Sequence, residues 1–182
     1  NKEQYVEFIS QVCKDALMSV VHAAQISDIR PELSGVLCDV EMSMVKFVAT
    51  DSFRLAEKTL FNKQFKMQMQ KGGRYIIPLK TVQEVIRMFS GDEVVRMYVE
   101  QNQIAFASQN QEIISRLIDG QYPDYEQIIP KTIESEIVMS KEKLVNAVKL
   151  VSSFSGKVNE IQIKTGEEGR VLEVFSANQS LG

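Results

Sequence analysis

The chain has 182 residues, of which 44% are hydrophobic and 25% charged, and its formal net charge is −3. This composition is typical of a globular protein with one ordinary domain or two small ones, and it argues against a uniformly basic surface. No apolar run approaches the ~20 residues that span a bilayer, and no signal-peptide core opens the chain, so we expect a cytoplasmic protein. The chain begins without Met and stops just after a strand-like segment, which indicates a piece of a longer protein.

The first predicted helix follows a short strand-like segment at residues 5–8, with Ser10 as its candidate N-cap. Apolar residues then recur at i, i+3, i+4 and i+7, which places them on one helix face. These residues are Ile9, Val12, Cys13, Ala16, Leu17, Val20 and Ala24. Alternating β patterns follow at residues 36–40 and 45–49, and a turn leads from there into a third strand that runs toward Leu60.

A second helix is predicted after a polar connection at residues 61–73, in which Met67 and Met69 are spaced as in an edge strand. Pro78 suits the start of this helix because its missing N–H is not needed there. The apolar stripe consists of Val82, Val85, Ile86 and Phe89, and Gly91 ends it. Three strand-like runs follow, at residues 94–99, 104–107 and 112–117, with a hairpin turn at residues 101–102. The predicted order is β-α-β-β-β, and then the same again.

Residues 115–130 have the pattern of an ordered connection between domains, with an Asp119-Gly120 turn signal and a closing Pro130. A flexible tether carries no aromatic residues, whereas this segment has apolar surface to bury. The side chains concerned are Tyr122, Tyr125, Ile128 and Ile129. We therefore expect the connection to pack against a neighbour.

The pattern restarts after Pro130 with a strand-like pair at residues 137–138 and a candidate N-cap at Ser140. A helical stripe then consists of Leu144, Ala147, Val148 and Val151. Two strand-like runs flank a turn at residues 165–169, and the end of the second run matches residues 47–51 in residue type. We infer a structural repeat whose second copy is cut off about halfway.

Catalytic and metal-binding motifs are scarce in this sequence. Cys13 and Cys38 lack metal-site spacing, and His22 has no ligand partner at a suitable spacing, so we interpret the cysteines as core thiols and expect neither a metal nor a cofactor. The best candidates for a paired-carboxylate site are Asp51 and Arg54 in the predicted turn, together with Asp119 and Asp124 in the connection. An Asp in a turn more often hydrogen-bonds its own backbone, and an Asp beside an Arg is most often a surface pair or a brace. We therefore predict that the protein is not an enzyme.

All three predicted helices carry positive charge opposite their apolar faces, at Lys14, Lys80, Arg87, Lys143 and Lys149. A solvated helix face usually has this pattern. If the helices line one surface, however, that surface is locally positive and suits sequence-independent contact with phosphates. The charge pattern alone leaves both interpretations open.

Two long motifs resemble the bacterial DNA sliding clamp, the beta subunit of the DNA polymerase III holoenzyme. They are Ala49-Thr50-Asp51-Ser52-Phe53-Arg54-Leu55-Ala56 and Ser115-Arg116-Leu117-Ile118-Asp119-Gly120-Gln121-Tyr122-Pro123-Asp124-Tyr125. Their order and the helix–strand spacing between them also fit the family, so the resemblance covers essentially the whole chain. It implies a middle domain at residues 1–125, followed at residues 126–182 by a linker and the truncated start of a third domain. The implied fold class is α+β, with repeated units of helices packed on antiparallel sheets and the helices lining a DNA channel.

The resemblance also implies a function, that of a processivity factor. A homodimeric ring would encircle double-stranded DNA without regard to sequence and would tether other proteins through their short peptides, which the resemblance implies are rich in Gln, Leu and Phe. These partners are the DNA polymerase III alpha subunit, the clamp loader, other polymerases and repair proteins. By resemblance, the DNA-facing residues are Lys14, Arg30, Lys80, Arg87, Lys143 and Lys149, and the walls of the peptide pocket include Thr50, Ser52, Phe53, Arg54, Leu55, Pro123, Gln127 and Ile128.

The chain departs from the family pattern in the pocket. Ser52 and Phe53 stand where the family commonly has Gly-His, and Gln127 replaces a frequent Arg, so we expect a narrower and less basic pocket tuned to different peptides. The family's first domain and much of its third are absent from this chain, which we do not expect to encircle DNA alone. Two alternatives remain: a docking module of clamp fold that does not encircle DNA, and a small enzyme that uses Asp51 and Arg54.

Overall fold

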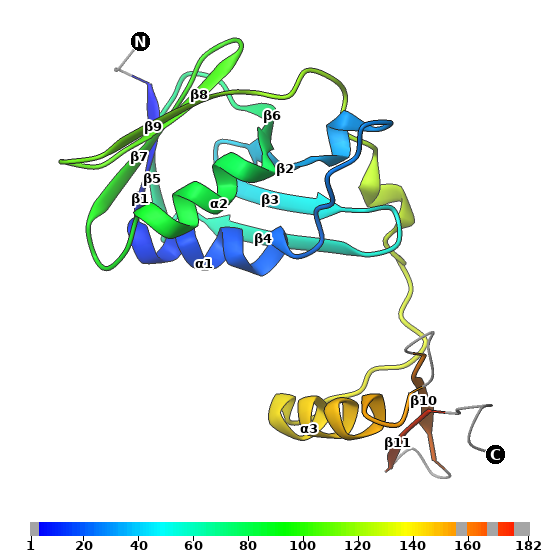
Figure 1. The fold of residues 1–182 in the computed structure, drawn as a ribbon. Coiled ribbons are helices and arrows are strands. Elements are labelled where there is room, and N and C mark those ends of the chain that lie inside the picture. Colours follow the sequence, from blue (N-terminus) through cyan, green and yellow to red (C-terminus); the bar gives the residue numbers. More distant parts are fainter. Residues whose placement is uncertain (1–3, 156–159, 167–170, 177–182) are drawn as a thin grey trace. The chain divides into compact units, whose positions relative to one another are not determined.

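The computed structural model describes residues 4–155, 160–166 and 171–176. These residues belong to two units, Asn1–Tyr125 and Glu126–Gly182, which we describe separately (Figure 1).

The first unit consists of two halves with the same order of elements. The first half contains β1 (Tyr5–Ile9), α1 (Ser10–Val21), the 3₁₀ helix η1 (Pro31–Leu33), β2 (Gly35–Val40), β3 (Met44–Thr50), β4 (Leu55–Phe61) and β5 (Phe65–Gln68). The second half contains β6 (Gly73–Pro78), α2 (Leu79–Met88), β7 (Val94–Val99), β8 (Gln103–Ala107) and β9 (Glu112–Arg116). The predicted β-α-β-β-β order thus occurs twice, and β5 is an additional strand within the segment predicted to be mostly a connection.

The strands form two antiparallel sheets, one of five strands in the order β5-β1-β7-β8-β9 and one of four in the order β4-β3-β2-β6. The first strand of the chain therefore lies between β5 and β7, which belong to different halves. After β9 the chain passes beside the four-stranded sheet, where the Ile118 N–H donates to the Ile76 carbonyl at 2.9 Å. Each of these two sheets thus contains strands from both halves.

The helices α1 and α2 lie side by side against the four-stranded sheet, with α1 on β3 and β4 and α2 on β2 and β6 (Figure 1). Their predicted apolar faces are confirmed, since Ala16, Leu17, Val20 and Val82 are fully buried. The core between helices and sheets includes four fully buried phenylalanines, Phe8, Phe47, Phe89 and Phe106.

Both cysteines are free and buried in this core, as the sequence predicts. Burial raises the pKa of the Cys13 thiol to about 12 and raises that of Cys38 as well. A buried thiol is held in its neutral form because the low-dielectric interior disfavours the thiolate. We therefore describe both cysteines as core residues.

The predicted N-cap of α1 is wrong. The capping position is occupied by Ile9, and Ser10 is the first helical residue, fully buried, with no hydrogen-bond partner for its Oγ among the described residues. The backbone N–H groups of Ser10 and Gln11 instead donate to the carbonyls of Glu93 and Gly91, at 2.8 and 3.1 Å. Ile9, predicted on the apolar face, has 42% of its surface exposed.

The predicted ends of α2 need a smaller correction. Pro78 is the last residue of β6 and the N-cap of α2, so the helix itself begins at Leu79. Phe89 lies just beyond the helix in an extended conformation, yet it is buried. Gly91 then adopts a φ of +73°, a conformation that glycine reaches without steric cost.

The second unit contains most of η2 (Tyr125–Ile128), together with α3 (Lys141–Ser152), β10 (Gln162–Thr165) and β11 (Leu172–Phe175). The predicted cap at Ser140 is confirmed, because its Oγ accepts a hydrogen bond from the Lys143 N–H at 3.4 Å. β10 and β11 pair antiparallel. The predicted strand at residues 137–138 is absent from the described structure, and both side chains there are exposed. The predicted repeat end at residues 177–178 lies outside the described residues.

None of the helices in the described part of the chain has the length and apolar content needed to cross a membrane.

Candidate functional site

A second apolar cluster covers the face of the four-stranded sheet that points away from the helices. Side chains alternate between the two faces of a strand, so Leu37 lies opposite its buried neighbours Val36 and Cys38. Leu37 is aligned with Val48 on β3 and with Ile76 on β6. The cluster comprises Leu33, Leu37, Val48, Ile76, Tyr122 and Tyr125, with Leu55 and Ile118 packed against it. We call it the tyrosine cluster.

The two tyrosines come from the predicted connection, which packs as expected. Tyr122 and Tyr125 are 4% and 2% exposed, and their rings meet edge to face at 6.5 Å between centroids. The Tyr122 hydroxyl donates to the Val48 carbonyl at 3.5 Å, and burial raises the pKa of Tyr122 to about 12. The expectation is wrong for Ile128 and Ile129, which are 70% and 41% exposed.

Beside this cluster, residues 50–55 form the turn between β3 and β4, and their polar side chains bond the turn's own backbone. Thr50 Oγ1 donates to the Arg54 carbonyl at 2.7 Å and accepts from the Ser52 N–H at 3.1 Å. Asp51 Oδ1 accepts from the N–H groups of Phe53 and Arg54, at 3.0 and 2.9 Å. The Arg54 guanidinium closes the turn by donating to Asp51 Oδ2 at 2.9 Å.

Asp51 is therefore a structural brace, which favours the non-catalytic interpretation of the Asp51–Arg54 pair. The backbone N–H groups of Arg54 and Phe53, followed by the Arg54 side chain, lower the pKa of the Asp51 carboxyl to about 2. A carboxylate with such a low pKa is a weak base at neutral pH.

Asp51→Asn should make folding less dependent on pH. Because the folded pKa is about 2, below the ~3.9 of an unfolded Asp, the ionised Asp51 stabilises the fold above about pH 4 and loses this effect as the pH falls toward 2. We expect the stability difference between wild type and Asp51→Asn to be largest at neutral pH and to shrink through that window. Urea unfolding at several pH values measures it. Asp119→Asn, at an exposed loop position, is the charge-matched control, and an equal pH dependence in both variants would contradict the prediction.

Ser52 adopts a φ of +77°, a left-handed conformation that a residue with a Cβ reaches only at a steric cost. A residue from another loop supports it, because Arg30 Nη1 donates to Ser52 Oγ at 3.2 Å. Arg30 Nε also lies 3.3 Å from Glu32 Oε1. The resemblance implies that Arg30 faces DNA, whereas here its guanidinium contacts the 50–55 turn.

The structure brings together some of the residues that were predicted to line a peptide pocket. Five of the predicted residues lie in the 50–55 turn, and Pro123 follows the buried Tyr122. Gln127 and Ile128 lie in η2 and belong to the second unit. The sequence patterns did not single out four further residues that pack in the tyrosine cluster, namely Leu33, Leu37, Val48 and Ile76. An apolar residue on the second face of a strand was the available signal, and Leu37 and Val48 both carried it.

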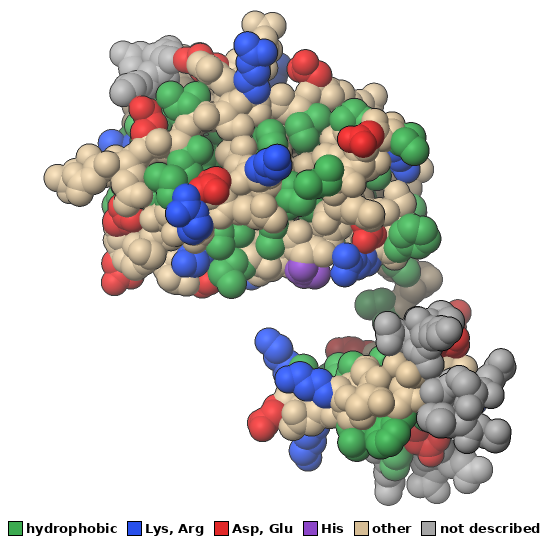
Figure 2. Space-filling model, viewed as in Figure 1, with side chains coloured by type: hydrophobic (Ala, Val, Ile, Leu, Met, Phe, Trp, Pro, Cys, Tyr) green, Lys and Arg blue, Asp and Glu red, His purple; other side chains and the backbone are tan. Residues whose placement is uncertain are grey.

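Apart from Arg30, the predicted DNA-facing residues of the first unit lie on the outer faces of the two helices. Lys80 and Arg87 are exposed on α2, and Lys14 is half-buried on α1. Carboxylates accompany them, since Glu84 accepts from Arg87 Nε at 3.0 Å and Asp15 follows Lys14 in the chain. Figure 2 accordingly shows basic, acidic and apolar side chains interspersed on this face. In the second unit, Lys143 and Lys149 are exposed on α3.

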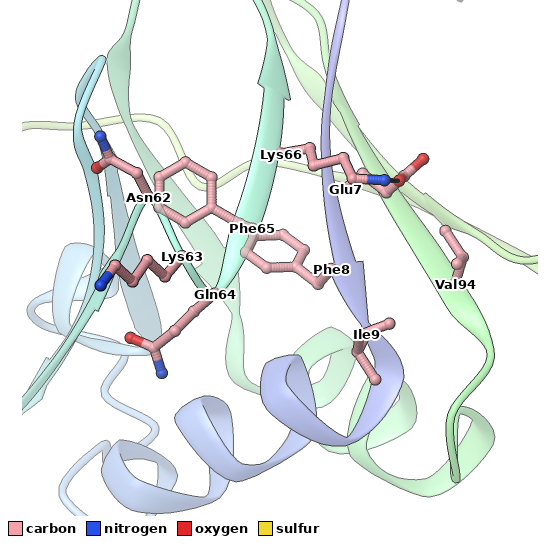
Figure 3. A pocket seen from close by; sticks show the side chains of 9 residues that line it. All are labelled: Glu7, Phe8, Ile9, Asn62, Lys63, Gln64, Phe65, Lys66 and Val94. Atoms are coloured by element: carbon pink, nitrogen blue, oxygen red, sulfur yellow. Dashed lines mark hydrogen bonds and ion pairs between the residues drawn. The ribbon is translucent and has the colours of Figure 1, made fainter.

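A surface pocket of about 300 Å³ lies elsewhere, beside β1 and the β4–β5 connection (Figure 3). Its apolar wall includes Phe8 and Phe65, whose ring centroids are 6.2 Å apart. Glu7, the carboxylate in its described lining, is paired with Arg96 at 2.9 Å and Lys66 at 3.3 Å. These hydrogen bonds, chiefly that from Arg96, lower the pKa of Glu7, so it is a poor proton donor. Within the described ranges, no group of three or more His, Cys, Asp or Glu residues is placed to hold a metal ion.

The family model and the curated relatives that match this chain indicate the same protein family. Residues 8–124 match the family model of the DNA polymerase III beta subunit, central domain. The chain is 28% identical to the beta sliding clamp of Bacillus subtilis over 97% of its own length and 50% of that protein. It is 27% identical to the beta sliding clamp of Staphylococcus aureus over its whole length and 48% of that protein. The chain therefore spans about half the length of the curated relatives it matches.

Solved structures show the same likeness. The DNA polymerase sliding clamp from Bacillus subtilis matches with a TM-score of 0.83 and 25% identity, over 98% of this chain and 50% of that one. The sliding clamp from Pseudomonas aeruginosa matches with a TM-score of 0.88 and 23% identity, over 97% of this chain and 48% of that one, and bears on the fold alone. The α+β arrangement of helices on antiparallel sheets is thus the clamp fold, as predicted.

Proposed function

This chain belongs to the DNA polymerase III beta subunit family through its central domain, and from that premise we propose that the full-length protein is a DNA sliding clamp. It would encircle duplex DNA as a homodimeric ring and tether the replicative polymerase to its template. The observation that carries this proposal is that the likeness to a solved sliding clamp extends beyond the matched central domain over nearly the whole chain. We assign residues 1–125 to the middle domain and residues 126–182 to the linker and the start of the third.

The sheet edges of the first unit support assembly with neighbouring domains. The edge at β6 is partly covered by the segment after β9, through the Ile118–Ile76 hydrogen bond, and β5 has only four residues. The edge strands β4 and β9 have seven and five residues. An unpaired edge strand of this length is a ready template for another strand. We propose that adjoining domains of the ring contact these two edges.

We propose that the helix faces bind DNA weakly, through Lys14, Lys80, Arg87, Lys143 and Lys149. The carboxylates beside Arg87 and Lys14 limit the local positive potential. Weak phosphate contacts suit a ring that is held on DNA by topology and must slide along it. We assign Arg30 to the edge of the peptide pocket instead of the DNA face, because its guanidinium bonds Ser52.

We propose that partner proteins dock short peptides against the 50–55 turn and the adjoining tyrosine cluster. Candidate partners are the DNA polymerase III alpha subunit, the clamp loader, other polymerases and repair proteins. Burying two or three apolar peptide side chains at about 1.5–3 kcal/mol each, less the cost of ordering the peptide, corresponds to an affinity of roughly micromolar order. Such an affinity allows partners to exchange, and the proposed role is that of a scaffold without catalytic activity.

The full-length protein should stay on circular DNA and leave linear DNA. We expect a clamp loader to place it on nicked circles, from which it co-elutes with the DNA in gel filtration, and linearising the circle should release it from the ends. The control is a second single-strand nick, after which the DNA is still circular. Equal retention on circular and linear DNA, or on neither, would contradict encirclement.

The alternative is a docking module of clamp fold that does not encircle DNA. The carboxylates interspersed on the helix faces are the observation that favours it (Figure 2). In that case peptide binding would persist in a protein that is never retained on circles.

A further inference from the structure

We propose that Phe53 is a specificity residue, which selects partner peptides carrying an aromatic or large aliphatic side chain next to the segment that occupies the pocket. The inference rests on the proposed function, because it concerns the same docking site. The preference concerns the peptide residue that flanks the docked segment, and Phe53 alone would determine it.

The backbone of the turn holds Phe53 in a defined position in solvent. Its side chain is 96% exposed, while its N–H is bonded to Asp51 Oδ1 and its neighbours are bonded to Thr50 and Arg30. This turn geometry requires the left-handed backbone conformation of Ser52. Because the backbone of the turn is already braced, a bound partner has to order only the two side-chain torsions of Phe53, which suits an interface anchor.

The charges around Phe53 favour an apolar partner over an acidic one. Arg54 is held by Asp51, and Arg30 by Glu32, so each guanidinium already has a carboxylate partner. Asp28 adds a further negative charge to the loop that carries Arg30. Both guanidinium groups near Phe53 thus already have a carboxylate partner, and an acidic peptide would gain little here.

The neighbouring loop offers a second apolar side chain. Ile29 precedes Arg30, is 91% exposed, and belongs to the segment that the Arg30–Ser52 hydrogen bond links to the turn. A partner that contacts both of these hydrogen-bonded loops would therefore meet two exposed apolar side chains, Ile29 and Phe53. A peptide whose flanking residue is Phe or Leu can bury part of the Phe53 ring, whereas one with Ala, Glu or Lys cannot.

The experiment uses the full-length protein and fluorescein-labelled peptides with the core Gln-Leu-Leu-Phe, which differ only in one flanking residue at either end: Phe, Leu, Ala, Glu or Lys. Fluorescence anisotropy gives each Kd. For wild type we expect a Phe flank to bind about 5- to 10-fold more tightly than an Ala flank, the size of an aromatic contact. Raising the salt concentration should not change this ratio.

In Phe53→Ala the ratio should fall to about 1, and in Phe53→Leu it should lie between the two, since an aliphatic side chain keeps part of the contact. Phe61→Ala removes another exposed phenylalanine, at the far end of β4, and is the matched control in which the ratio should persist. A flank preference that survives in Phe53→Ala, or that favours Glu, overturns the inference.

Leu55→Lys separates the two proposals. If core peptides bind wild type and fail to bind Leu55→Lys, but no flank preference exists, the pocket stands and only the role of Phe53 is wrong. If no peptide of the set binds wild type, the docking site itself is wrong and the inference about Phe53 falls with it. Retention on circular DNA is independent of both results and tests encirclement alone.

Discussion

Leu55→Lys in the full-length protein will weaken binding of a Gln-Leu-Leu-Phe peptide by about 100-fold. Leu55 is half-buried, packs against the tyrosine cluster, and is both the last residue of the 50–55 turn and the first residue of β4. A lysine there removes apolar contact worth about 1.5–3 kcal/mol and obliges a docked apolar side chain to desolvate an ammonium group. Since about 1.4 kcal/mol corresponds to a factor of ten, the two effects together give the expected loss.

The variant should remain folded, because a half-exposed lysine can extend its ammonium group into water. Met42→Lys is the control for added charge: Met42 is 65% exposed in the turn between β2 and β3, at the opposite end of β3 from the docking turn. Anisotropy titrations measure the affinity, and circular dichroism with urea unfolding measures the fold. Unchanged peptide affinity in a folded Leu55→Lys variant would remove the docking site from the proposed function.

Phe47→Ala will destabilise the first unit by about 3–5 kcal/mol, whereas Phe53→Ala will change its stability by less than about 0.5 kcal/mol. The two phenylalanines are six positions apart, but Phe47 is 0% exposed in the main core and Phe53 is 96% exposed. Removing the buried ring leaves a cavity among close-packed neighbours, and removing the exposed ring leaves none.

This pair of variants makes the same chemical change in two environments, so each is a control for the other. Urea unfolding followed by circular dichroism gives both free energies. A domain of ordinary stability, about 5–15 kcal/mol, could lose much of it through Phe47→Ala. Similar free energies for the two variants would mean that Phe47 is not in the core or that Phe53 is not in solvent.

The secondary structure and the turn chemistry of this protein followed from the sequence because they depend on near neighbours. A helix face repeats every 3.6 residues and a strand face every two. The apolar stripe from Cys13 to Val20 and the alternation in β2 and β3 could therefore be predicted from short stretches of sequence. The role of Asp51 in the turn could be predicted for the same reason, because the N–H groups that it binds lie two and three residues away. The two long motifs likewise indicated the family, because each is a continuous run of residues.

The N-cap of α1 and the strand β5 show where local patterns fail. Ser10 has the right chemistry for a cap, but the carbonyls of Glu93 and Gly91 already accept the first helical N–H groups, and these residues lie about eighty positions away in the sequence. For β5, the spacing of Met67 and Met69 indicated an edge strand, but the segment was predicted to be mostly a connection, and pairing with β1 makes Phe65–Gln68 a strand.

The candidate site likewise combines features that depend on neighbouring residues with features that depend on distant ones. Local sequence was enough to predict the β-α-β-β-β order of the first unit, the buried cysteines, the braced turn and the packed tyrosines of the connection. The three-dimensional arrangement was needed to show that Arg30 bonds Ser52, twenty-two residues away, and that Tyr122 reaches Val48, seventy-four residues away. Such contacts depend on which strands pair and which faces they bury, and no local periodicity encodes them, because pairing is a competition among all the segments of the folded chain.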